Sequence, residues 1–140
     1  MSGNASNRTR MGLWAVTAGY MAAIFYFSSL PGSRLPIQPG VWDHLLHFLA
    51  YWGLGASIAL SVGDPAMTWR QAMIAIVIGI TFGASDEWHQ SFVPLRNASL
   101  ADWVYDALGV IVGVPLVWTL MRRSGGSGEQ VSVEKKIDRL

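Results

Sequence analysis

Long blocks of apolar residues without charged side chains constrain this chain more than any other feature. The first block, residues 11–30, contains twenty residues and no charge, and it lies between Arg10 and Pro31. A helix needs about 20 such residues to cross a bilayer. A water-soluble core would instead show apolar residues at helical or strand spacing with polar residues between them. Together with 51% hydrophobic and 14% charged residues among 140, the blocks predict an all-α integral membrane protein.

Turn and cap signals divide the chain into four helical segments. Residues 11–30 are too long for the apolar region of a secretory signal, so we expect an uncleaved span. The second segment covers residues 44–62 and ends at a Gly-Asp-Pro turn. Thr68 and Gln71 fit a capping box for the third segment, and Ser99 begins a similar pattern for the fourth. The four segments predict a four-helix bundle built from two helical hairpins.

Three acidic residues adjoin the uncharged parts of the third and fourth segments. These parts, residues 71–85 and 107–121, contain only fifteen residues each. Because a spanning helix needs about 20, we expect Asp86, Glu87 and Asp106 to lie inside the helices, near the edge of the membrane.

The arginines predict the orientation of the bundle. One side has five of them and the other side has two, with Arg8, Arg10, Arg70, Arg122 and Arg123 on the first and Arg34 and Arg96 on the second. Because cytoplasmic loops carry the excess of Lys and Arg, we expect a multi-pass cell-membrane protein with both termini in the cytoplasm. Residues 1–123 would form the transmembrane domain. Residues 124–140 begin with a Ser-Gly-rich run and would form a flexible, charged cytoplasmic tail.

Most of the polar side chains in the segments fall toward the outer leaflet. We expect ten of them to form a ligand-binding pocket: Asp43, His44, His47, Tyr51, Asp86, Glu87, Gln90, Arg96, Asp102 and Asp106. Acidic groups at membrane depth are costly unless they are paired or hydrated, so the second, third and fourth helices should turn these faces together around Arg96. Small residues spaced four apart, at Gly79 and Gly83 and at Gly109 and Gly113, would allow close helix approach.

Three sequence blocks resemble the VanZ-like family of membrane proteins. They are Trp42-Asp43-His44-Leu-Leu-His47-Phe48-x-x-Tyr51, Asp86-Glu87-x-x-Gln90-x-Phe92-x-Pro94-x-Arg96 and Asp102-x-x-x-Asp106-x-x-Gly109. The blocks occur in the same order and at the same helix ends as in that family, and the resemblance covers most of residues 12–121. His44 stands where the family usually has Lys, and Asp106 where it favours Asn. The resemblance implies an association with resistance to the glycopeptide teicoplanin, but it does not imply a defined chemistry.

Three functions remain open from the sequence. The favoured one is an accessory protein, not an enzyme, whose outward pocket binds an envelope lipid, a lipid-linked precursor or a glycopeptide head group. The second is a membrane enzyme that uses His47, Glu87, His89 and Asp106 as acids, bases or metal ligands. The third is a polar cluster that only holds the helices together. Because no HExxH or other tight ligand motif is present, we expect no metal or other cofactor, and the absence of a basic stripe argues against nucleic acid.

Overall fold

The computed structural model is all-helical, as predicted. It describes residues 2–34, 41–63 and 67–137, with the backbone alone for residues 2–6 and 124–137. Four α-helices and one 3-10 turn make up this part of the chain: α1 (Ser2–Ser28), η1 (Gly32–Arg34), α2 (Val41–Val62), α3 (Trp69–Gln90) and α4 (Leu100–Ile137).

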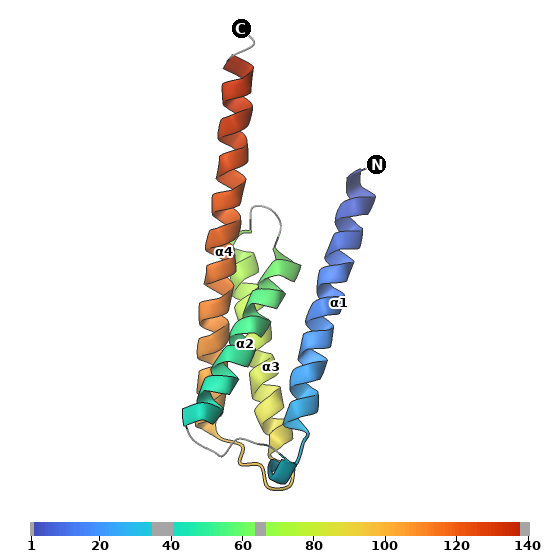
Figure 1. Ribbon diagram of the computed structural model, residues 1–140, viewed down its shortest axis with the longest axis vertical. Coiled ribbons are helices and arrows are strands. Elements are labelled where there is room, and N and C mark those ends of the chain that lie inside the picture. The colour runs from blue at the N-terminus through green and yellow to red at the C-terminus, as the bar shows by residue number, and fades with distance from the viewer. Residues whose placement is uncertain (1, 35–40, 64–66, 138–140) are drawn as a thin grey trace.

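The four helices lie side by side, with both termini at the same end of the bundle (Figure 1). We call this end the terminal end, and the opposite end, where η1 and residues 91–99 lie, the loop end. α2 contacts α1, α3 and α4, whereas α1 and α4 do not contact each other within the described residues. This arrangement agrees with two hairpins, α1–α2 and α3–α4.

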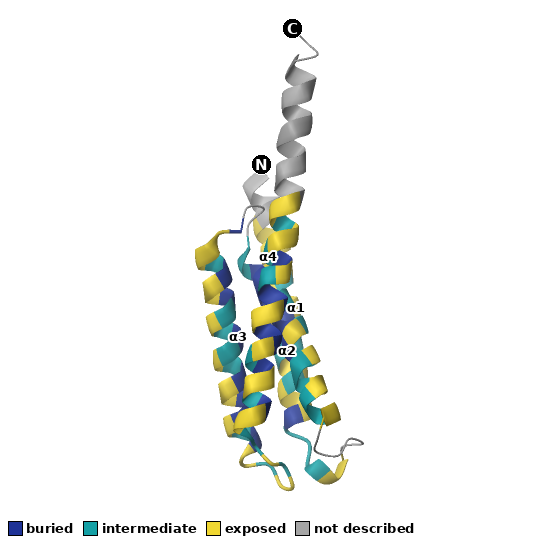
Figure 2. Cartoon of the chain, turned by 90° about the vertical axis from the view of Figure 1, so that its left-hand side faces the viewer, coloured by how far each residue is buried: buried dark blue, intermediate teal, exposed yellow. Residues whose placement is uncertain are grey.

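Three of the helices are long and apolar enough to cross a membrane. The candidate spans are Asn7–Ser28, Val41–Val62 and Leu100–Arg123. Exposed residues cover the outer faces of the bundle (Figure 2), and many of them are large and apolar, such as Phe25 and Val77. Outward apolar side chains of this number suit lipid rather than water. The chain is therefore a membrane protein.

The N-terminal caps of α3 and α4 agree with the capping patterns predicted from the sequence. Thr68 caps α3 in a capping box, because its hydroxyl accepts from the Gln71 backbone while the Gln71 side chain accepts from the Thr68 backbone. At the start of α4 the Ser99 hydroxyl accepts from the Asp102 N–H at 3.1 Å and donates to its carboxylate. The backbone of α4 continues as a helix beyond residue 123 to Ile137. The flexible tail predicted for residues 124–140 stays a prediction.

Glycines create the close contact between α2 and α4. A Cβ atom at Gly113 would overlap the carbonyl oxygen of Trp52, and one at Gly109 would overlap that of Phe48. Gly55 of α2 meets α4 in the same way, since its Cβ would lie 2.9 Å from the Cα of Val110. The predicted role of the small residues is thereby confirmed. This close approach brings the first turns of α4 against the first turns of α2.

We expect Gly113→Ala to destabilise the bundle, whereas Gly19→Ala should not. The added methyl at position 113 must push α2 and α4 apart, at a cost of about 1–3 kcal/mol. Gly19 lies on α1 with nothing within 4 Å of its Cβ position, so the same change there should be neutral or stabilising. Denaturant unfolding of both variants in detergent micelles measures the difference. Equal stability would contradict the contact.

Candidate functional site

Polar residues from all four helices meet at the loop end. His47 of α2 is at the centre of the larger group. Its Nδ1 lies 2.9 Å from Oδ1 of Asp106 on α4 and 3.9 Å from Oε1 of Glu87 on α3. The side chains of His47, Glu87 and Asp106 are 12%, 9% and 0% exposed. We call these three residues the His47 cluster.

The start of α4 is tied directly to Glu87. The backbone N–H of Ser99 donates to Oε2 of Glu87 at 3.0 Å. In a capping box this N–H would bond to the side chain three residues later. Here a carboxylate on a neighbouring helix takes that place, so the cap also fixes one oxygen of Glu87 and leaves the other directed toward His47.

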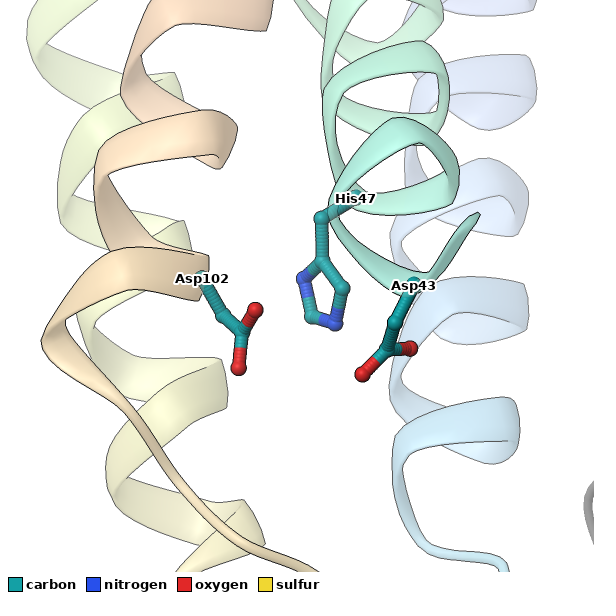
Figure 3. A group of neighbouring side chains, drawn as sticks. All are labelled: Asp43, His47 and Asp102. Carbon is teal, nitrogen blue, oxygen red and sulfur yellow. The ribbon is translucent and has the colours of Figure 1, made fainter. Parts of the chain in front are cut away.

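A second acidic pair lies nearer the surface of the loop end. Asp43 and Asp102 point toward the imidazole of His47 (Figure 3), and one ligand atom from each of the three residues lies within 4.8 Å of the other two. Asp102 also lies 3.3 Å from Nε2 of His44. The His44 ring stacks on Tyr105 of α4 with ring centroids 4.6 Å apart. His44 is thus held against α4.

A separate polar group joins α1 to α3. The Ser28 hydroxyl lies 2.6 Å from both carboxylate oxygens of Asp86, and the Gln90 amide donates to Asp86 at 3.2 Å. Asp86 is 2% exposed. Ser28 was not among the predicted site residues, although its position at the polar end of the first apolar block was a signal. The predicted site thus extends to α1.

The hydrogen-bond partners of Arg96 differ from the predicted ones, which were the acidic side chains. Its guanidinium donates to the backbone carbonyls of Phe27 and Leu30 at 2.6 and 3.2 Å, at the carboxyl end of α1. Carbonyls at the carboxyl end of a helix lack the usual helical partners, and the Phe27 carbonyl also accepts from the Leu30 N–H at 3.2 Å. A cation is well placed at this end of α1. Within the described residues no salt bridge joins Arg96 to a carboxylate. Arg96 therefore does not pair with the acids, although it lines the same cavity as Asp43 and Asp86.

A tight turn sets the position of Arg96. Its N–H bonds to the carbonyl of Val93 at 3.2 Å, and Leu95 has a positive φ of 59°. Pro94 followed by a positive φ is typical of a type II turn. The turn also contacts the start of η1, since the Gly32 N–H donates to the Pro94 carbonyl at 3.2 Å.

A cavity of about 500 Å³ lies between α1, α2 and α3. Its lining divides into an apolar part, formed by residues such as Tyr20, Ile24 and Ala50, and a polar part. The polar part consists of Ser28, Asp43, His47, Tyr51, Asp86, Gln90 and Arg96. Six of the ten predicted site residues therefore line one cavity. His47 belongs both to this lining and to the His47 cluster with Glu87 and Asp106.

Four buried oxygen atoms at this end have no hydrogen-bond partner among the described residues. They are the Tyr51 hydroxyl, Oε1 of Glu87, Oδ1 of Asp102 and Oδ2 of Asp106. Buried polar atoms in proteins are nearly always satisfied, so unpaired ones indicate a role outside the fold's own bonding.

His89 takes no part in either group. Its Nε2 lies 3.0 Å from the Ser29 hydroxyl, and its ring stacks on Phe25 with centroids 4.2 Å apart. Both partners belong to α1 or its end. His89 therefore anchors α1 and does not join the His47 cluster, in contrast to its inclusion among the candidate catalytic or metal-binding residues.

Comparison with known proteins identifies the family of the chain. Searches of curated proteins and of solved structures give no significant match. The family model described as VanZ/LLP1 matches residues 12–122, which include every polar residue of the two groups. The chain therefore belongs to the VanZ/LLP1 family.

Proposed function

We propose that the cavity between α1, α2 and α3 binds the head group of an envelope lipid or of a lipid-linked precursor. The observation that carries this proposal is the division of its lining. Tyr20, Ile24 and Ala50 offer an apolar surface for a lipid chain, while Asp43 and Asp86 offer acceptors at the polar part. Ligand pockets commonly combine a mostly apolar lining with a few polar groups that fix orientation.

The charges favour a head group that carries hydrogen-bond donors. Asp43 and Asp86 accept hydrogen bonds when ionised, and the Tyr51 hydroxyl has no partner among the described residues. Arg96 has five N–H donors, which allows it to contact a phosphate in addition to the carbonyls of α1. Ammonium, hydroxyl or amide groups beside a phosphate would suit this combination.

We place the loop end at the extracytoplasmic face, with both termini in the cytoplasm of a multi-pass protein. The terminal end carries Arg10, Arg70 and Arg122, and Arg10 bonds to the Val62 carbonyl there. The positive-inside tendency supports this orientation. An outward site could take the head group of a lipid-linked wall precursor or a glycopeptide, which would explain an accessory role in antibiotic resistance.

A second candidate function is a membrane-embedded enzyme that acts on a lipid-linked substrate. The contact of 2.9 Å between His47 and Asp106 favours it, because an imidazole held by a carboxylate can act as a general base. His47 also lines the cavity, so its ring lies beside the space in which a substrate would bind. Hydrolysis of a lipid-linked phosphate or sugar by the purified protein, lost in His47→Gln, would favour this function over binding alone.

Phosphatidylethanolamine should bind more tightly than phosphatidylcholine, by roughly tenfold if one charge-assisted hydrogen bond to a carboxylate is gained. The two head groups have the same net charge, but only the first has N–H donors. Native mass spectrometry of the purified protein with each lipid measures the ratio. Asp43→Asn should reduce it. Equal affinity for both lipids would contradict the role of the carboxylates.

Filling the cavity should reduce lipid binding. Ala23 lines the cavity and its neighbour Ala22 does not, although both are exposed on α1. We therefore expect Ala23→Trp to lower phosphatidylethanolamine occupancy and Ala22→Trp to leave it unchanged, by the same mass measurement. If both variants bind as the unmodified protein does, the lipid lies elsewhere, and a purely structural role for the polar cavity becomes the better interpretation.

Cysteine labelling tests the orientation directly because the chain contains no cysteine. Ser91, at the loop end, and Asn7, near the terminal end, are both exposed. A membrane-impermeant maleimide added to intact cells should label Ser91→Cys and should label Asn7→Cys only after lysis. The reverse pattern would invert the proposed topology.

A further inference from the structure

We infer that His47, Glu87 and Asp106 bind a divalent transition-metal ion between α2, α3 and α4. Glu87 and Asp106 are not among the residues that line the cavity. It does not require the cavity to hold a lipid. From the sequence we expected no metal, and ligation by His47, Glu87, His89 and Asp106 was only an alternative, because such ligands come from three helices and form no local motif.

One ligand atom each of His47, Glu87 and Asp106 lies within 4.8 Å of the other two, which is close to the spacing that one cation requires. Atoms bound to a common ion at about 2.1 Å lie roughly 3.0–3.4 Å apart in tetrahedral or octahedral geometry. Nδ1 of His47 lies 2.9 Å from Oδ1 of Asp106 and 3.9 Å from Oε1 of Glu87. The separation between His47 and Glu87 exceeds this range by about 0.5 Å, so binding of an ion requires Glu87 to move closer to His47. One imidazole nitrogen and two carboxylate oxygens suit Zn²⁺ or Mn²⁺ better than Ca²⁺.

Two unpaired oxygen atoms within the cluster point independently to a ligand. Oε1 of Glu87 and Oδ2 of Asp106 are buried and have no hydrogen-bond partner among the described residues. Their side chains are 9% and 0% exposed. The other oxygen of Glu87 is held by the Ser99 N–H, so the free one is fixed toward His47. A cation bound by Oε1 of Glu87 and by both oxygens of Asp106 would supply the partner that the two unpaired atoms lack.

The surplus of negative charge at the loop end supports the same conclusion. Five carboxylates lie there, at Asp43, Asp86, Glu87, Asp102 and Asp106. The neighbouring arginine, Arg96, is directed to backbone carbonyls of α1. Isolated carboxylates at membrane depth are costly, and an ion of charge +2 offsets two of them where they are most buried.

The surroundings of His47 also suit a metal ligand. Metal-binding histidines usually use their other ring nitrogen to contact a carboxylate or carbonyl, which fixes the ring. Asp43 and Asp102 point toward the ring of His47 (Figure 3) and come within 4.8 Å of one of its nitrogens. His47 also lines the cavity.

Metal binding by the purified full-length protein tests this site. After chelator treatment and dialysis, we expect the protein to bind one Zn²⁺ per chain, and Mn²⁺ in competition with it. Glu87→Gln and Asp106→Asn should each weaken binding by at least about tenfold, since even the loss of an outer partner costs 10–100-fold. His89→Gln, which changes a histidine of α3 outside the cluster, should bind as the unmodified protein does.

A spectroscopic measurement on the unmodified protein keeps the test decisive if a variant does not fold. Pulsed electron paramagnetic resonance of bound Mn²⁺ should show coupling to one histidine nitrogen. The absence of that coupling, or of stoichiometric binding, would overturn the site. So would retention of the metal in Glu87→Gln together with its loss in Asp43→Asn, because the ion would then lie among Asp43, His47 and Asp102.

Discussion

The close contact between α2 and α4 is the constraint on which the rest of the site depends. Gly109 and Gly113 face the carbonyls of Phe48 and Trp52 with no room for a Cβ atom. Asp106 lies one turn before Gly109, so the same contact places its carboxylate next to α2. There Oδ1 of Asp106 lies 2.9 Å from Nδ1 of His47. A wider helix spacing would let water or lipid reach this carboxylate. The glycines therefore set both the packing and the chemistry.

The carboxylates near His47 differ in how far their hydrogen bonds are satisfied. On the side of α1, Asp86 is satisfied by Ser28 and Gln90, so its carboxylate can be buried at low cost. On the side of α4, Glu87 and Asp106 each keep one unpaired oxygen. The unpaired oxygens of Glu87 and Asp106 are the reason for assigning the cation to the His47 cluster. The head group is assigned to the cavity because of its volume and its mixed apolar and polar lining.

Much of this arrangement could be predicted from the sequence, because the length of the apolar segments and the spacing of the polar residues determine it. The short uncharged cores placed Asp86, Glu87 and Asp106 inside helices, and the structure confirms this. The partners of Arg96 could not be predicted, because they are the backbone carbonyls of Phe27 and Leu30. Every residue has a backbone carbonyl, so such a partner leaves no pattern in the sequence. Helical periodicity shows which residues share a face, but it does not show which neighbouring helix that face meets. The contribution of α1 was missed for that reason.

α3, which supplies Asp86 and Glu87, is not apolar enough to be a candidate membrane span. α3 is absent from the three candidate spans, because its last turns carry charged and polar residues. Those residues are buried against other helices, whereas Met73, Ile74 and Val77 are exposed and apolar. Lipid contacts only the exposed face of α3. The free-energy cost of placing the polar face in the membrane therefore depends on the residues packed against that face, and not on the average hydropathy of the helix. A helix of this kind is stable in a membrane only inside its bundle, and the polar site and the bundle must form together.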